Sequence, residues 1–171
     1  MSTPPLEPSD SFAISACQGW LELGNSDEAT AEWEHLSPAA RRHPAGLEMK
    51  WMLLAHRCQW DEAVGVGDQL VVCAPDSCAG WLHRAYAIRR AKSGGLQQAF
   101  ESLHPAAALF PEVDTIAYNL ACYSTQLGKP DEGWEWYLRT LQIANEPARV
   151  KQVALNDPDL EPLYQRIRKH P

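Results

Sequence analysis

The sequence predicts an all-α fold in which four antiparallel helix hairpins form a repeat array, followed by C-terminal capping helices. Two observations favour this prediction. A tripeptide landmark recurs at a regular interval, and the apolar residues that follow each copy have the period of a helix. The Ala, Leu, Glu and Gln content also favours helix, and strand formers do not gather into alternating runs.

The landmark is an acidic pair followed by a small residue. Asp61 follows Asp27 by 34 residues, and Asp131 follows Asp61 by 70, which is two periods plus two residues. The missing copy is Gln97-Gln98-Ala99, and the two extra residues fall in the turn Ser93-Gly94-Gly95. The copies are Asp27-Glu28-Ala29, Asp61-Glu62-Ala63, Gln97-Gln98-Ala99 and Asp131-Glu132-Gly133.

The small third residue is expected where the two helices of a hairpin cross, because a larger side chain would push them apart. A core stripe follows it at i+4 and i+7. The i+4 residues are Trp33, Gly67, Leu103 and Tyr137, of which only Gly67 is not bulky. The i+7 residues are Leu36, Leu70, Ala106 and Thr140.

Proline and glycine mark the expected helix ends. Pro44, Pro75 and Pro111 are each predicted to end a second helix, because proline lacks an N–H and disfavours helix in the residue before it. Gly24 and Gly128 are predicted to cap first helices in the left-handed conformation. The predicted pairs are 11–23 with 26–40, 45–58 with 60–73, 78–91 with 95–109, and 114–127 with 130–144.

The chain resembles the tetratricopeptide repeat (TPR) family. Its period matches that family, and so does the spacing of 28 residues from Leu47 to the closing Pro75. Large residues anchor the first helices, namely Trp20, Trp51, Trp81 and Tyr118. The resemblance implies a right-handed α-solenoid with repeats over 10–43, 44–77, 78–113 and 114–147. Lys50-Trp51 and Gly67 depart from the family pattern, so the second repeat is expected to pack less regularly.

The two ends of the chain are predicted to lie outside the repeats. Residues 1–9 are expected to form a disordered tail, and 148–171 to form capping helices. A helix over 148–156 is followed by Asp157 as N-cap and Pro158 as first residue of a last short helix, which ends near Lys169. This ending looks like that of many bacterial TPR proteins, in which a half-polar helix covers the last repeat.

Composition excludes several functions. The net charge is −7 and the sequence pI about 5.3, which disfavours binding to nucleic acid or to an anionic membrane. The N-terminus lacks the features of a signal peptide, and no apolar run reaches the length of a membrane span. We therefore expect a cytoplasmic protein.

No motif indicates catalysis, a cofactor or a metal, so we predict that the protein is not an enzyme. The nearest approach to a metal site is Cys73, Cys78 and His83, but zinc sites use two close ligand pairs and the second pair is absent. The acidic pairs of the landmark suit helix N-termini better than acid–base chemistry.

The resemblance implies a concave groove lined by the first helices, where a peptide or protein segment binds. The expected partner-binding residues are Gln18, Met49, Met52, Leu82, His83, Tyr86, Arg90, Tyr118, Asn119 and Cys122. For Met49, Met52, Leu82 and Tyr86, packing inside the groove is an equally good interpretation. A clamp for a C-terminal carboxylate is not expected, because the corresponding positions are Ile14, Gln18, Met49, Ala79 and His83.

Two functional alternatives stay open. The first is an adaptor that binds another protein in the groove. The second is a dedicated chaperone or assembly factor that acts as a homodimer, for which one of Trp134 and Trp136 is expected to be exposed on the second-helix side. The C-terminal helices could also fold back and fill the groove.

Overall fold

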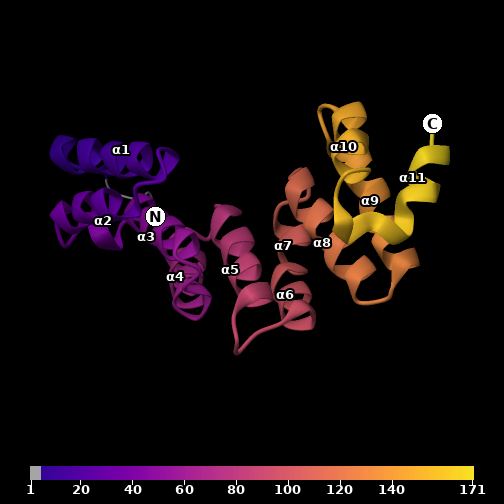
Figure 1. Ribbon diagram of the computed structural model, residues 1–171, viewed down its shortest axis with the longest axis horizontal. Helices are drawn as coiled ribbons and strands as arrows, with labels where there is room; N and C mark the ends of the chain where they lie inside the picture. Colours follow the sequence, from indigo (N-terminus) through magenta and orange to yellow (C-terminus); the bar gives the residue numbers. More distant parts are fainter. Residues whose placement is uncertain (1–4) are drawn as a thin grey trace. The chain divides into compact units, whose positions relative to one another are not determined.

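The computed structural model describes residues 5–171, and every regular element in that range is a helix, as the sequence predicts (Figure 1). The chain forms two compact units, of which the first ends at Gly94 and the second runs from Gly95 to Pro171. The predicted tail, 1–9, lies partly outside the described residues. Helix α1 begins within it at Pro8, because proline is a favourable first helical residue.

The first unit contains two complete hairpins and the first helix of the third. Its elements are α1 (Pro8–Glu22), α2 (Ser26–His35), the 3-10 helix η1 (Ala40–Arg42), α3 (Pro44–His56), α4 (Trp60–Cys73) and α5 (Ala79–Arg90). The small landmark residues Ala29 and Ala63 are fully buried, as predicted. Two apolar clusters form the core, one around Cys17 and Leu53 and the other around Trp51 and Leu70.

Two boundaries in this unit differ from the prediction. The second helix of the first hairpin ends at His35 and not near residue 40, because Pro38 disfavours helical geometry in Ser37. Ser37 instead bonds to the buried Asp10, through N–H and Oγ donors that each lie 2.8 Å from a carboxylate oxygen. Pro44 begins α3 and does not end the preceding helix.

The same turn closes three hairpins. Gly24 and Gly128 have φ of +76° and Cys58 has φ of +55°, so all three are left-handed, as predicted for the two glycines. The next residue bonds back to the end of the first helix, with Asn25 N to Trp20 O at 2.8 Å and Lys129 N to Ser124 O at 3.0 Å. Cys58 adopts this conformation despite its Cβ.

The structure explains why position 67 has a glycine where the repeat pattern expects a bulky residue. A Cβ there would lie 2.8 Å from the Cα of Arg84, and a Cβ on Gly80 would lie 2.8 Å from the backbone N of Val71. Helices α4 and α5 therefore approach closely, because Gly67 faces the backbone of α5 and Gly80 faces the backbone of α4. The sequence predicts less regular packing of the second repeat, and at Gly67 the missing side chain permits a close approach of the two helices.

The landmark aspartates each bond to a residue about one repeat further along the chain. Asp27 pairs with Arg57 at 3.0 Å, and Asp131 pairs with Arg166 at 2.7 Å. Asp61 accepts the Oγ–H of Ser93 at 2.7 Å, and its pKa is lowered mainly by that hydrogen bond. These exposed contacts add little stability, but they join segments that lie 30–35 residues apart in the chain.

The second unit begins with α6, which lies in the helix predicted over 95–109. Its elements are α6 (Leu96–Leu103), α7 (Ala106–Leu109), α8 (Asp114–Gln126), α9 (Pro130–Ile143), α10 (Pro147–Ala154), the 3-10 helix η2 (Pro158–Leu163) and α11 (Tyr164–Lys169). The predicted helix 95–109 is interrupted between α6 and α7, because Pro105 cannot donate a backbone hydrogen bond. Ala99 and Gly133 are buried, as predicted for the landmark.

The C-terminal segment packs on α8. The carboxylate of Asp157 caps η2 by accepting the N–H of Asp159 at 3.0 Å, and Pro158 is its first residue, as predicted. Leu160, Leu163 and Ile167 are fully buried. No helix within 5–171 has the length and apolar character needed to cross a bilayer.

Candidate partner-binding surface

An aromatic cluster lies in the first unit, on α3, α5 and the start of α4. The ring of Trp51 stacks on His83 with centroids 4.1 Å apart and planes at 13°, and meets the edge of Tyr86 at 5.9 Å. Trp60 lies 5.7 Å from Tyr86 at a tilt of 59°. We call Trp51, Trp60, His83, Tyr86 and Arg90 the aromatic cluster. It joins α3, α5 and the start of α4.

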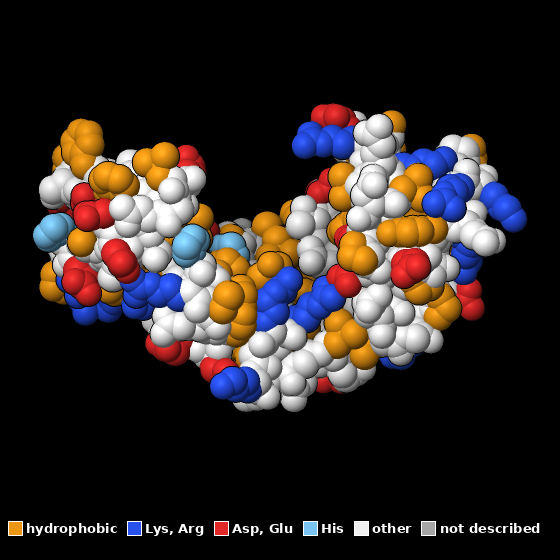
Figure 2. All heavy atoms as spheres, viewed as in Figure 1, with side chains coloured by type: hydrophobic (Ala, Val, Ile, Leu, Met, Phe, Trp, Pro, Cys, Tyr) orange, Lys and Arg blue, Asp and Glu red, His pale blue; other side chains and the backbone are white. Residues whose placement is uncertain are grey.

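Arg90 lies over the cluster. Its guanidinium carbon is 3.4 Å from the ring centroid of Tyr86 and 5.5 Å from that of Trp60, and its Nη1 donates to the backbone oxygen of Tyr86 at 3.2 Å. Basic side chains lie among hydrophobic ones over α5 (Figure 2). Arginine favours such stacked geometry because its planar charge interacts with an aromatic face.

Burial affects the ionisation and the hydrogen bonding of other residues in the aromatic cluster. Burial lowers the pKa of His83 below its ordinary 6.5, so its imidazole is neutral near pH 7. The Nε1–H of Trp51 is buried and has no hydrogen-bond acceptor among the described residues. Tyr86 stays 40% exposed, and Arg90 is exposed as well.

The predicted site residues of the first unit fall into two groups. His83, Tyr86 and Arg90 come together in the aromatic cluster, and Met52 is half-buried between the two core clusters. Met49 is only 7% exposed and packs in the core with Cys17 and Leu53. Of the two interpretations open for Met49, core packing agrees with this position.

Gln18 and Leu82 lie outside the aromatic cluster. Gln18 is exposed on α1 and donates to Glu22 at 3.0 Å. Leu82 is half-buried on α5. Neither contributes to the ring stack.

The predicted residues of the second unit lie on α8 beneath the C-terminal segment. Tyr118 donates its hydroxyl to Asp157 at 2.9 Å, and the thiol of Cys122 lies 3.6 Å from the same carboxylate oxygen. Gln126 donates to the backbone oxygen of Asp159 at 2.9 Å. The C-terminal segment thus folds back over this part of α8, one of the arrangements that the sequence leaves open. Asn119 is half-buried and donates to its own helix.

These contacts leave little chemistry for a metal. Cys122, Asp157 and Asp159 can bring one ligand atom each within 4.8 Å of one another. However, Asp157 caps η2 and also accepts from Tyr118, so its oxygens already have structural partners. Burial first, then the nearby Cys122 and the bond to Asp157, raises the pKa of Tyr118 far above its usual range.

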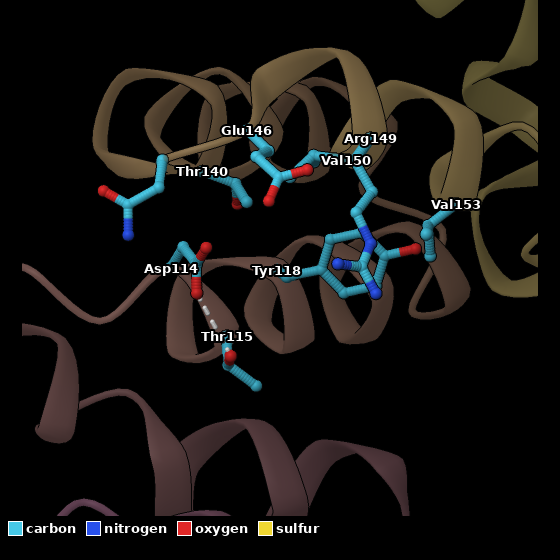
Figure 3. A pocket seen from close by; sticks show the side chains of 9 residues that line it. Asp114, Thr115, Tyr118, Thr140, Glu146, Arg149, Val150 and Val153 are labelled. Atoms are coloured by element: carbon cyan, nitrogen blue, oxygen red, sulfur yellow. Dashed lines mark hydrogen bonds between the residues drawn. The ribbon is translucent and has the colours of Figure 1, made fainter.

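A pocket opens beside the first turns of α8, with a volume of about 360 Å³ (Figure 3). Asp114, Thr115 and Tyr118 line it from α8, and α10 contributes Arg149 and Val153. The Thr115 hydroxyl donates to Asp114 at 3.2 Å. The sequence did not predict this pocket, because α10 was expected only as a cap and no motif marks the residues that line it.

Trp134 and Trp136 are both half-buried, and basic side chains cover them. The guanidinium carbon of Arg166 lies 4.7 Å from the Trp134 ring, and that of Arg139 lies 5.3 Å from the Trp136 ring. The expectation that one of them is exposed is wrong, since the chain's own arginines occupy their faces.

The sequence did not predict that Trp51 and Trp60 contribute to this surface. Trp51 was expected only as an anchor of its first helix, and Trp60 only as the start of the helix predicted over 60–73. A usable signal was present, because no Asp or Glu occurs between Asp76 and Glu101, while Arg84, Arg89, Arg90 and Lys92 do. In an acidic chain, such a stretch indicates a local basic surface.

Comparison with known proteins confirms the fold class. No protein-family model matches the chain, and no curated protein sequence matches it. Solved structures of MamA, a helical solenoid of the TPR type, are similar. One, "Crystal structure of MamA protein", has a TM-score of 0.68 at 18% identity and covers 94% of this chain and 88% of its own. Another, "Crystal structure of MamA", has a TM-score of 0.66 at 18% identity, with coverages of 97% and 93%.

Proposed function

We propose that this protein binds a segment of a partner protein on the exposed face of the aromatic cluster, and that it performs no catalysis. The observation that carries the proposal is Tyr86, a large side chain that stays 40% exposed while rings and a guanidinium hold it on three sides. Tyrosine and tryptophan dominate the binding energy of protein interfaces.

The rigidity of this surface supports the proposal. Binding costs free energy when side chains lose rotamer freedom, and a side chain already held by its neighbours loses less. Trp51, Trp60 and Arg90 each contact the Tyr86 ring. The half-buried Met52 lies against the same core on α3 and is adaptable enough to contact different partners.

The net charge favours a protein partner in the cytoplasm over nucleic acid, because a chain of net charge −7 repels a polyanion. A surface with apolar rings and a single stacked cation is also typical of recognition of a short segment with a few anchors. The role that fits best is therefore an adaptor.

The test uses a phage-displayed library of random peptides, selected on the purified protein. Affinities of the selected peptides are then measured by fluorescence anisotropy for wild type, Tyr86→Glu and a control, Val72→Glu. Val72 is 80% exposed on α4, so the control introduces the same charge elsewhere. We expect Tyr86→Glu to weaken binding by roughly tenfold or more, and Val72→Glu to leave it unchanged. Equal affinities for all three proteins would place the binding surface elsewhere.

The alternative of a homodimeric chaperone or assembly factor makes a separate demand, since it requires a face for a second copy. The arginines over Trp134 and Trp136 weaken the case for that face. Light scattering of the purified protein distinguishes the two functions. A stable dimer that Trp136→Ser dissociates into monomers would favour the chaperone or assembly factor, and a monomeric wild type would favour the adaptor.

A further inference from the structure

Arg90 carries a positive charge that has no acidic partner among residues 5–171. Ion pairs within this range include those of Arg57, Arg84, Lys129 and Arg166, whereas Arg90 contacts aromatic rings and one backbone oxygen. Stacking on Tyr86 at 3.4 Å fixes the plane of the guanidinium. Its position on the exposed side leaves N–H donors available to a ligand.

The surroundings of Arg90 share its charge. Arg89 and Lys92 lie within two residues, and α5 contains no acidic residue. Arg84, one turn and a half earlier, pairs with Asp68 at 3.5 Å. Asp61 of α4 accepts the backbone N–H of Lys92 at 3.3 Å, so carboxylates of α4 lie near Arg84 and Lys92, whereas Arg90 has none as a partner in the described part of the chain.

The side chains of the aromatic cluster offer donors in excess of acceptors. Arginine has five N–H donors and no acceptor, and one Nη of Arg90 bonds to Tyr86 O. A ligand group that complements this surface supplies oxygen acceptors and a negative charge, and the planar fork of a guanidinium matches a carboxylate best.

We infer that Arg90 binds the carboxylate of an Asp or Glu side chain in the partner segment, while a neighbouring apolar residue of that segment packs against Tyr86. This inference rests on the proposed function and adds the chemical class of the bound segment. A single guanidinium can pair with a side-chain carboxylate at any position of the bound segment. The inference therefore requires no free C-terminus.

A nucleic acid is the rival ligand, since arginine and aromatic rings also stack on bases. The structure favours the acidic peptide. Binding to a phosphate backbone draws on several cations, whereas Arg84 is already paired and the chain as a whole is acidic. One stacked guanidinium between aromatic rings fits one carboxylate.

The experiment repeats the peptide selection on wild type, Arg90→Gln, and Arg42→Gln, an exposed arginine on η1 that serves as matched control. We expect Asp and Glu to be enriched in peptides selected by wild type and by Arg42→Gln, and not by Arg90→Gln. One acidic peptide and its Glu→Gln counterpart, both amidated at the C-terminus, are then titrated by fluorescence anisotropy against each protein. Circular dichroism checks that helicity is unchanged.

The two substitutions should depend on each other. Glu→Gln in the peptide should weaken binding to wild type about fivefold or more, and should have no effect with Arg90→Gln, because both changes remove the same contact. Peptides that need Tyr86 but show no acidic enrichment would overturn this inference and leave the proposed function standing. If no peptide depends on Tyr86, the proposed function fails as well. Displacement of the acidic peptide by a 12-nucleotide oligouridine at equal concentration would make nucleic acid the ligand and overturn the inference.

Discussion

Helices α5 and α8 are both first helices of a predicted hairpin. They differ in whether another segment of the same unit covers their aromatic side chains. On α5, Tyr86 remains 40% exposed beneath an unpaired arginine. On α8, Tyr118 and Cys122 bond to Asp157 of the C-terminal segment. A repeat thus supplies similar faces, and what covers each face decides whether it can bind a partner.

Both helices approach a neighbouring helix through glycine, so the difference lies in what else covers them. Two glycines, Gly67 and Gly80, bring α5 close to the backbone of α4. Gly133 brings α9 close to α8, since a Cβ there would lie 3.0 Å from a backbone oxygen of α8. Helix α8 is covered in addition by the C-terminal segment, in which Leu160 and Leu163 are fully buried.

Leu160→Ala is expected to have the largest effect. It removes a fully buried side chain from the cover of α8 and should lower the free energy of unfolding by about 2–5 kcal/mol. Urea unfolding measures the loss, and hydrogen exchange should show weakened protection in α8 with α3 unchanged. The control is Glu161→Ala, which is exposed. A loss below about 1 kcal/mol would mean that the segment does not hold α8.

Gly67→Ala tests the glycine contact of α5. The new Cβ would lie 2.8 Å from Arg84 Cα, so the helices must separate, and we expect a loss of about 1–3 kcal/mol. Gly65→Ala is the matched control, because nothing lies within 4 Å of its Cβ. That change should stabilise the helix by about 0.5–1 kcal/mol. Similar results for both variants would show that α4 and α5 are not closely packed.

Cys58→Gly compares the turn of the first unit with that of the second, where Gly128 occupies the equivalent place. A non-glycine residue at φ +55° is strained, so glycine should stabilise the protein by about 0.5–1 kcal/mol. Thermal unfolding measures the change. The reverse substitution, Gly128→Ala, should destabilise by about 1 kcal/mol. A stabilising Gly128→Ala would contradict the left-handed turn.

The smallest expected effect is the contribution of His83, on α5, to the pH dependence of stability. Burial lowers the pKa of His83 in the folded state, so the unfolded chain binds a proton first as pH falls. Its contribution is present above the unfolded value of about 6.5 and is lost as pH falls through the lower folded value. Urea unfolding at pH 7.5 and 5.5 should therefore show a larger loss for wild type than for His83→Gln. An equal loss in both proteins would mean that His83 is not buried against Trp51.

The sequence predicted much of the fold because helical period and landmark spacing are local signals. It predicted the buried Ala29, Ala63, Ala99 and Gly133, and the cap at Asp157. It missed the break at Pro105 and the early end of the helix at His35, since helical patterning continued past both. It grouped His83, Tyr86 and Arg90 by helical phase but could not place Trp60, which comes from another helix.

By itself, the sequence determined the helical class, the repeat and the left-handed turns at Gly24 and Gly128, because each depends on residues close together in the chain. Tertiary structure alone decided which predicted surface residues stay accessible. Met49 packs in the core and Cys122 lies beneath residues 157–163, while Tyr86 remains open. The physical reason is that accessibility depends on what packs against a side chain from distant segments. Helical phase specifies only the direction in which that side chain points.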